Sequence, residues 1–255
     1  DIPVYQPVKL REEENVQIIR DYQPDAIVVA AYGQILPESI LNIPQYGCIN
    51  IHASLLPKYR GAAPIQWAVL DGEEKTGITT MYMEKGLDTG DMIDKAEVVL
   101  DKKETAGSLH DKLMVLGADL LLETLKKLED GTAVREKQND EESCYAKMLS
   151  KDMGQIDFTK SAREIECLIR GMNPWPSAYT SLDGKTMKVW EADVLDAQSK
   201  EEPGTIVEVN KKEIIVATGS NDLALHEIQL AGKKRMQVQA FLLGYQVEAG
   251  TKLGE

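Results

Sequence analysis

The sequence has few of the residues that build covalent cross-links and metal sites. Its three cysteines, Cys48, Cys144 and Cys167, are far apart and form no Cys-x-x-Cys pair. This spacing argues against a structural zinc site and favours a reducing compartment, so we expect a cytoplasmic protein. The three histidines are equally scattered. The sequence therefore predicts no metal cofactor.

Long hydrophobic runs are also missing. No apolar segment approaches the roughly 20 residues that a membrane-spanning helix needs, so we expect no membrane partner. The first residues lack the charged and apolar regions of a signal peptide. With 255 residues, 43% hydrophobic and 28% charged, the chain is long enough for one large or two ordinary soluble domains.

The charge is strongly negative and unevenly distributed. The net charge of −13 speaks against nucleic acid as a partner. However, 17 basic and 27 acidic residues lie up to Asp152, against 12 and 15 from Met153 on. A local basic patch in the second part, around Lys233, Lys234 and Arg235, therefore stays open beside the alternative of an ordinary solvated loop.

The first half alternates between strand-like and helix-like segments. Residues 25–31 form a continuous apolar run typical of a strand buried on both faces, and 48–52 is a second short strand. A helix is expected over 63–70, strands over 76–83 and 92–99, and a long helix over 105–129. Such alternation predicts βαβ units and an α/β fold with a mostly parallel, Rossmann-like sheet.

The second half is composed differently. Residues 131–150 are polar and charged and favour an interdomain linker. After an amphipathic helix from Ser161 to Arg170, short strands separated by turns predict a small, OB-like β-barrel. We therefore expect three parts, which are a catalytic domain (1–132), a linker (133–152) and a C-terminal β-barrel domain (153–255).

The stretch from Gly47 to Pro64 carries the most chemical information. Ile49 and Ile51 alternate with Asn50 and His52, so an amide and an imidazole project from the same face of a strand. Ligands of open α/β sheets bind just beyond the carboxyl ends of strands. A structural histidine, or an asparagine that caps a turn, remains the plainer alternative for each residue.

A third polar residue completes the candidate site. Asp88 lies in a tight connection, 86–91, between two predicted strands. Aspartate and glycine are also common turn residues, so a purely structural role is the alternative.

Assembled in this order, the motifs make the chain resemble the formyltransferase family that uses 10-formyltetrahydrofolate. The motifs that carry the resemblance are Asn50-x-His52, Ser54-Leu55-Leu56-Pro57 and Asp88 within Leu87-Asp88-Thr89-Gly90. Further matching segments, 31–37, 60–66, 173–176, 203–206 and 231–234, are typical of the members that act on methionyl-initiator tRNA. Several motifs in the right order are far more specific than one.

The resemblance implies formyl transfer from 10-formyltetrahydrofolate to the α-amine of methionyl-initiator tRNA, in translation initiation. It implies that Asn50, His52 and Asp88 are catalytic. Asn50 would donate to the oxyanion, His52 would donate to it or relay a proton, and Asp88 would orient His52 and accept the proton of the amine. It also implies that Ser54, Leu55, Leu56 and Pro57 line the folate site, with no metal and no obligate protein partner.

The resemblance also raises an expectation about the beginning of the chain. Family members open with a strand and a glycine-rich loop that have no counterpart before Asp1, so we expect an N-terminally truncated chain with an exposed sheet edge.

Three other functions remain possible from the sequence. One is a formyltransferase that acts on an amino-sugar nucleotide or a glycinamide ribotide. Another is an inactive fragment that only binds RNA. A metal-dependent hydrolase is the most distant of the three, because no ligand cluster accompanies His52 and Asp88.

Overall fold

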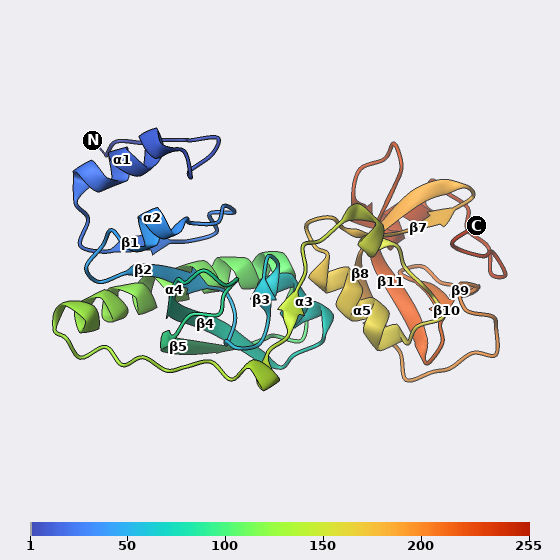
Figure 1. Cartoon of the computed structure of the whole chain (residues 1–255). Helices are drawn as coiled ribbons and strands as arrows, with labels where there is room; N and C mark the ends of the chain where they lie inside the picture. Colours follow the sequence, from blue (N-terminus) through green and yellow to red (C-terminus); the bar gives the residue numbers. More distant parts are fainter. Residues whose placement is uncertain (1) are drawn as a thin grey trace. The chain divides into compact units, whose positions relative to one another are not determined.

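The computed structural model describes residues 2–255, which form two compact units, each assembled from separate segments of the chain (Figure 1). The first unit contains residues 2–64, Lys75–Val99 and Asp111–Lys147. The second contains Ile65–Glu74, Leu100–His110 and Met148–Glu255. Two stretches of the first half of the chain therefore belong to the second unit.

A four-stranded sheet forms the centre of the first unit. Its strands follow the order β1 (Ile27–Val29), β2 (Cys48–His52), β4 (Lys75–Tyr82) and β5 (Met92–Val99). All four strands lie within or overlap the segments that the sequence predicts. β4 is buried along nearly its whole length, whereas β5 alternates between buried and exposed residues. This alternation is typical of a strand with one solvent-facing side.

The pairing corrects the expectation of a mostly parallel sheet. β1 pairs with β2 in parallel, but β2 with β4 and β4 with β5 pair antiparallel. The connection from Tyr82 to Met92 is too short for the crossover that a parallel pair requires. The α/β class is confirmed, whereas the mostly parallel sheet is wrong for the strands of residues 2–255.

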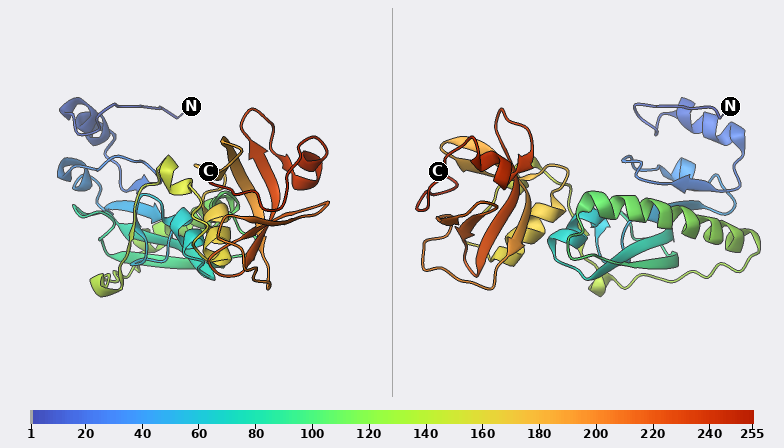
Figure 2. Two further views of the ribbon diagram at one scale, coloured as in Figure 1. Left: turned by 90° about the vertical axis from the view of Figure 1, so that its right-hand side faces the viewer. Right: turned by 180° about the vertical axis from the view of Figure 1, so that it is seen from behind.

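Helices flank this sheet. They are α1 (Glu13–Tyr22), α2 (Glu38–Leu41) and the long α4 (Ala106–Glu129), while α3 (Pro64–Leu70) lies largely in the second unit. From Asp111 on, α4 runs along one face of the sheet (Figures 1 and 2). A Cβ on Gly117 would lie 3.1 Å from Ile51 of β2, so the helix approaches the strand closely there. The stripe predicted as core contributes the buried Leu109, Leu113 and Leu120.

A short parallel pair joins two distant parts of the first unit. β3 (Arg60–Gly61) pairs with β6 (Tyr145–Ala146), with Arg60 opposite Tyr145 and Gly61 opposite Ala146. The 3₁₀ turn η1 (Asp140–Glu142) precedes β6, and a second one, η2 (Lys151–Gly154), follows it. Part of the segment predicted as a linker therefore pairs with the residues that follow β2.

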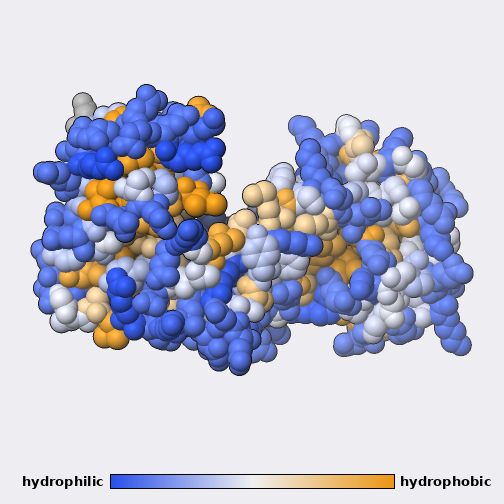
Figure 3. All heavy atoms as spheres, viewed as in Figure 1, coloured by the Kyte–Doolittle hydropathy of each residue, from blue (hydrophilic) through white to orange (hydrophobic). Residues whose placement is uncertain are grey.

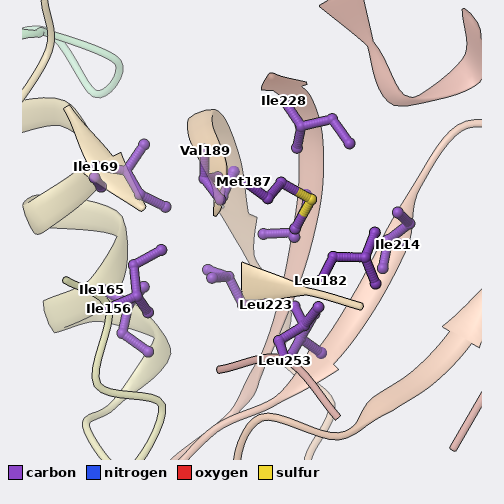
Figure 4. Close-up of a cluster of buried hydrophobic side chains, with 14 of the residues drawn as sticks. Ile156, Ile165, Ile169, Leu182, Met187, Val189, Ile214, Leu223, Ile228 and Leu253 are labelled. Atoms are coloured by element: carbon purple, nitrogen blue, oxygen red, sulfur yellow. The ribbon is translucent and has the colours of Figure 1, made fainter. Parts of the chain in front are cut away.

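The second unit is built on an antiparallel sheet. Its strands are β7 (Ala178–Leu182), β8 (Lys185–Val194), β11 (Asp222–Leu230), β10 (Ile214–Ala217) and β9 (Ile206–Val209) in spatial order, with β12 (Met236–Gln237) paired to β11. Besides α3, it contains the helices α5 (Ala162–Gly171) and α6 (Val238–Leu242). Ile165 and Ile169 of α5 point toward Met187, Val189 and Ile228 of the sheet (Figure 4). A β-rich second unit is confirmed, and its closure into a barrel stays a prediction.

Apolar surface is concentrated in the N-terminal part of the first unit. Tyr5, Ile19, Val28 and Leu36 help to line an apolar groove between α1 and β1, and Val28 is 41% exposed. Figure 3 shows hydrophobic surface between hydrophilic atoms in this part of the chain. No helix within residues 2–255 is both long and apolar enough to cross a bilayer.

Candidate active site

β2 presents Asn50 and His52 on the face of the sheet opposite α4. Ile49 and Ile51, the alternate residues, lie on the side that packs against α4. His52 is 5% exposed, whereas Asn50 is half-buried. Among residues 2–255 the side-chain amide of Asn50 has no hydrogen-bond partner. A partly exposed amide without a partner can donate to a ligand.

The imidazole of His52 is hydrogen-bonded at one nitrogen and faces a carboxylate with the other. Its Nε2 lies 2.9 Å from the carbonyl oxygen of Tyr59. A carbonyl only accepts hydrogen bonds, so Nε2 carries a proton and donates it. The other nitrogen, Nδ1, lies 3.8 Å from Oδ2 of Asp88. The structure therefore brings together the histidine and the carboxylate that are 36 positions apart in the sequence.

Asp88 is held in place by the loop after β2. Its Oδ2 accepts a hydrogen bond from the backbone N–H of Gly61 at 2.8 Å. Gly61 has a φ of 118°, and a Cβ there would lie 2.7 Å from the carbonyl oxygen of Ala146. Only glycine fits this close approach without displacing the chain. The position of the carboxylate thus depends on residues 59–61 and on β6.

The four residues predicted for the folate site follow β2 directly. Ser54 and Leu56 are fully buried, whereas Leu55 and Pro57 are half-buried. The hydroxyl of Ser54 donates to the carbonyl of Lys58 at 2.6 Å. The hydroxyl of Thr79 donates to the carbonyl of Ser54 at 2.7 Å and accepts from the N–H of Leu56 at 3.1 Å. These bonds fix the turn and leave Leu55 and Pro57 as its accessible side chains.

Sequence reasoning missed the groups that hold the site together. They are the carbonyl of Tyr59, the N–H of Gly61 and the side chain of Gln138. Backbone groups carry no sequence signal. Gln138 lies in a polar stretch that composition predicts to be a linker, and nothing in its neighbours distinguishes it.

Arg60 and the acidic groups nearby form ion pairs rather than a metal site. The guanidinium is 12% exposed, and it donates to Gln138 Oε1 at 2.9 Å and to Asp140 Oδ1 at 2.8 Å. In the part of the chain that the structure describes, no three His, Cys, Asp or Glu side chains are grouped so that they could hold a metal ion.

Comparison with known families accounts for most of the chain. The formyl transferase family matches residues 2–125, and the formyl transferase C-terminal domain matches residues 148–246. The chain is also 58% identical over 254 residues to the methionyl-tRNA formyltransferase of Clostridioides difficile, which covers 100% of this chain and 82% of that protein. The chain belongs to the methionyl-tRNA formyltransferase family. This confirms the resemblance carried by the sequence motifs.

Other members of the methionyl-tRNA formyltransferase family agree with this placement. The enzyme of Agathobacter rectalis is 58% identical over 250 residues, with 98% of this chain and 81% of that protein covered. The enzyme of Lachnospira eligens is 56% identical over 259 residues, with 100% of this chain and 82% of that protein covered.

Solved structures share the fold at lower identity. HypX from Aquifex aeolicus, solved in complex with tetrahydrofolic acid, matches with a TM-score of 0.66 at 16% identity, over 92% of this chain and 44% of that one. The sugar 3N-formyl transferase WlaRD, solved in the presence of dTDP and 5-N-formyl-THF, matches with a TM-score of 0.65 at 20% identity. The match covers 84% of this chain and 77% of that one.

Proposed function

We propose that this chain transfers the formyl group of 10-formyltetrahydrofolate to the α-amine of methionyl-initiator tRNA, in the cytoplasm, as a step of translation initiation. The observation that carries the proposal is the approach of Asp88 to His52 at the end of β2, on the face of the strand that also bears Asn50, in a chain of this family. Membership of the family supports the donor and the acceptor, and the geometry supports the roles that we propose for the residues.

The polar groups at the end of β2 fit the formyl end of such a donor. The amide of Asn50 is half-buried and has no partner within residues 2–255, so it is available to a carbonyl oxygen. Leu55 and Pro57, the accessible side chains of the turn that follows β2, offer apolar surface. When bound, the folate supplies an activated formyl group and a nitrogen that leaves with a proton.

In this mechanism Asn50 stabilises the charge that develops on the formyl oxygen. Its N–H groups are aimed by a rigid strand, so they need no reorganisation as the charge forms. The α-amine of the methionyl group is the nucleophile, so the enzyme needs no covalent intermediate of its own.

His52 and Asp88 handle the proton that the amine loses. Nε2 of His52 is already engaged with the carbonyl of Tyr59, so Nδ1 is the ring nitrogen left for proton transfer. A proton that arrives on Nδ1 faces the carboxylate of Asp88 at 3.8 Å. Asp88 also accepts the proton directly or through water, and the proton then passes to the departing folate nitrogen. This geometry favours a proton relay over direct donation by His52 to the formyl oxygen.

The second unit offers the polyanionic acceptor a basic loop. Lys233, Lys234 and Arg235 are exposed between β11 and β12, and the Arg235 guanidinium lies 4.5 Å from the ring centre of Trp190. We assign tRNA contacts to this loop.

The proposal also includes the domain organisation expected from the sequence. It assigns a catalytic domain to residues 1–132, a linker to 133–152 and a closed β-barrel to 153–255.

The test is formyl transfer by the whole chain, with 10-formyltetrahydrofolate and either methionyl-initiator tRNA or an amino-sugar nucleotide as acceptor. Asn50→Ala and Asp88→Ala are compared with Asn15→Ala, because Asn15 is a residue of α1 whose side chain donates to the carbonyl of Lys9. We expect transfer to the tRNA, with kcat lower by about 10² to 10³-fold in the first two variants. The Asn15 variant should keep the parental rate.

Two results would overturn the proposal. Transfer to the amino sugar but not to the tRNA would make the acceptor wrong. Binding of tRNA without transfer to either acceptor, by a chain that is folded by circular dichroism, would mean a binding protein rather than an enzyme.

A further inference from the structure

The side chain of Gln138 is buried beside the loop that carries Asp88. It is 8% exposed. Its Nε2 donates to two carbonyl oxygens, those of Asp88 and Gly90, each at 2.8 Å. Its Oε1 accepts from Nε of Arg60 at 2.9 Å. Both N–H groups and the oxygen of this amide are therefore engaged, which is how a buried amide is normally satisfied.

The loop needs such support because of its backbone. Asp88 has a φ of 53°, in the left-handed region that residues other than glycine adopt only when their surroundings hold them there. The two carbonyls that Gln138 grips lie on either side of Thr89. The amide thus clamps the turn that sets the direction of the Asp88 side chain.

Gln138 also fixes the group that Asp88 bonds. The carboxylate accepts from the N–H of Gly61, and the neighbouring Arg60 is held by Oε1 of Gln138. Arg60 and Gly61 are further anchored by their pairing with β6. Gln138, Arg60, Gly61 and Asp88 therefore form a closed ring of contacts. Gln138 is the one member of the ring that bonds both the Asp88 loop and the segment after β2.

We propose that Gln138 is a positioning residue for formyl transfer, which acts by holding Asp88 at the correct place relative to Nδ1 of His52. This inference rests on the proposed function. Gln138 acts through Asp88 and does not touch either substrate. A segment that composition marks as a linker is, on this view, part of the support of the active site.

The experiment uses Gln138→Glu in the whole chain. A glutamate keeps the length of the side chain and can still accept from Arg60, but an ionised carboxylate cannot donate to the two carbonyls. Gln138→Met, which is similar in length and uncharged, separates loss of the donors from the added charge. Gln45→Glu is the matched control, because Gln45 is an exposed glutamine that donates to Asp25 before β2 begins.

Three readouts are compared. We expect kcat to fall about tenfold or more in Gln138→Glu and Gln138→Met, with KM for both substrates within about threefold, since a small displacement of a catalytic group mainly slows the chemical step. Adding Gln138→Glu to Asp88→Asn should lower kcat by less than about twofold further, because both changes act through the same carboxylate. Deuterium exchange should become faster in the 84–92 peptide and at the N–H of Gly61, but not in Gln45→Glu.

The outcomes separate this inference from the proposed function. If the parent chain transfers no formyl group, the proposed function fails, and the exchange experiment still decides whether Gln138 holds the Asp88 loop. Any of three results would overturn the positioning role. They are a parental kcat in both Gln138 variants, losses of kcat from Gln138→Glu and Asp88→Asn that multiply fully in the double variant, and unchanged deuterium exchange in the 84–92 peptide.

Discussion

At the scale of single residues, burial separates the three cysteines. Cys48 lies in β2 and is 2% exposed, and burial raises the pKa of its thiol from the usual 9.0 to about 11. Burial also raises the pKa of Cys167, against the opposing effect of the nearby Arg170 guanidinium. Cys144 is exposed on the segment that leads into β6. The thiolate is the reactive form of cysteine, so the three should differ in reactivity.

Alkylation with iodoacetamide tests this difference. At pH 8 we expect Cys144 alone to be labelled in the native chain, with Cys48 and Cys167 labelled only after unfolding in urea. Mass spectrometry of tryptic peptides identifies the labelled sites. Labelling of native Cys48 at the rate of Cys144 would show that β2 opens under native conditions.

The raised pKa of Cys48 also has a defined effect on stability. The folded thiol stays neutral up to about pH 11, whereas the unfolded thiol ionises from about pH 9. Ionisation of this thiol therefore does not lower the free energy of unfolding below pH 9. As the pH rises from 9 toward 11, the unfolded thiol loses its proton before the folded one, and the free energy of unfolding falls.

At the scale of elements, α5 shows how one helix combines surface and buried polar contacts. Ser161 caps its first turn, and Glu164 returns a bond to the N–H of Ser161 at 2.9 Å, which completes a capping box. On the buried face, Arg170 bonds both oxygens of Glu166 at 2.5 and 2.9 Å and the carbonyl of Glu104 at 2.9 Å. This pair connects α5 to residues 100–110 within the second unit.

Removing the buried partner should destabilise the protein strongly. Arg170→Ala leaves the carboxylate of Glu166 buried without its main counter-charge, and we expect a loss of about 3–5 kcal/mol in the free energy of unfolding. Arg163→Ala is the control, because Arg163 also bonds Glu166, but its side chain is 60% exposed. We expect a loss of no more than about 1 kcal/mol for it. Urea unfolding measures both, and equal losses would contradict the assignment.

At the scale of the whole molecule, the units do not follow the order of the chain. Residues 65–74 and 100–110 belong to the second unit, although they precede the end of α4. A Cβ on Gly171 of α5 would lie 2.6 Å from Cγ of Leu70, which shows how closely the inserted segment packs.

A fragment cut at the sequence boundary should therefore be less stable than the same residues in the whole chain. Residues 153–255 alone lack Leu70 and Glu104, which contact α5. We expect the fragment to unfold at a lower urea concentration than the whole chain. The near-ultraviolet circular dichroism of Trp175 and Trp190 monitors the unfolding. If the fragment and the whole chain unfolded at the same urea midpoint, residues 65–74 and 100–110 would contribute little to the stability of the second unit.

The net negative charge of the molecule opposes the binding of a polyanion such as tRNA. A chain of net charge −13 needs a local cationic surface to bind tRNA, and the loop with Lys233 and Lys234 is the one that we assign.

Salt and mutation test this assignment together. We expect KM for methionyl-tRNA to rise steeply with salt, and Lys233→Ala with Lys234→Ala to raise it several-fold and flatten the salt dependence, because fewer phosphate contacts release fewer counterions. The pair Lys211→Ala and Lys212→Ala, exposed between β9 and β10, is the control. An equal effect of both pairs would mean a general charge effect rather than a binding loop.

The sequence by itself determined the local elements and the identity of the candidate site residues. Alternation of apolar and polar residues placed β2, β5 and α4 correctly, because burial on one face imposes a period of 2 or 3.6 residues. The long helix predicted over 105–129 is confirmed, and Gly131 just after it has a φ of 68°, in the left-handed region that favours glycine. The motif order was also sufficient to find the family.

Only the tertiary structure decided how these pieces support one another. The predicted helix ends at Arg170, yet α5 includes Gly171, where Leu70 leaves no room for a Cβ. The antiparallel pairing of β4, the hold of Gln138 on the Asp88 loop and the membership of residues 65–74 in the second unit depend on contacts between distant segments. Local patterns report which face of an element is buried, and they carry no information about which distant residue covers it.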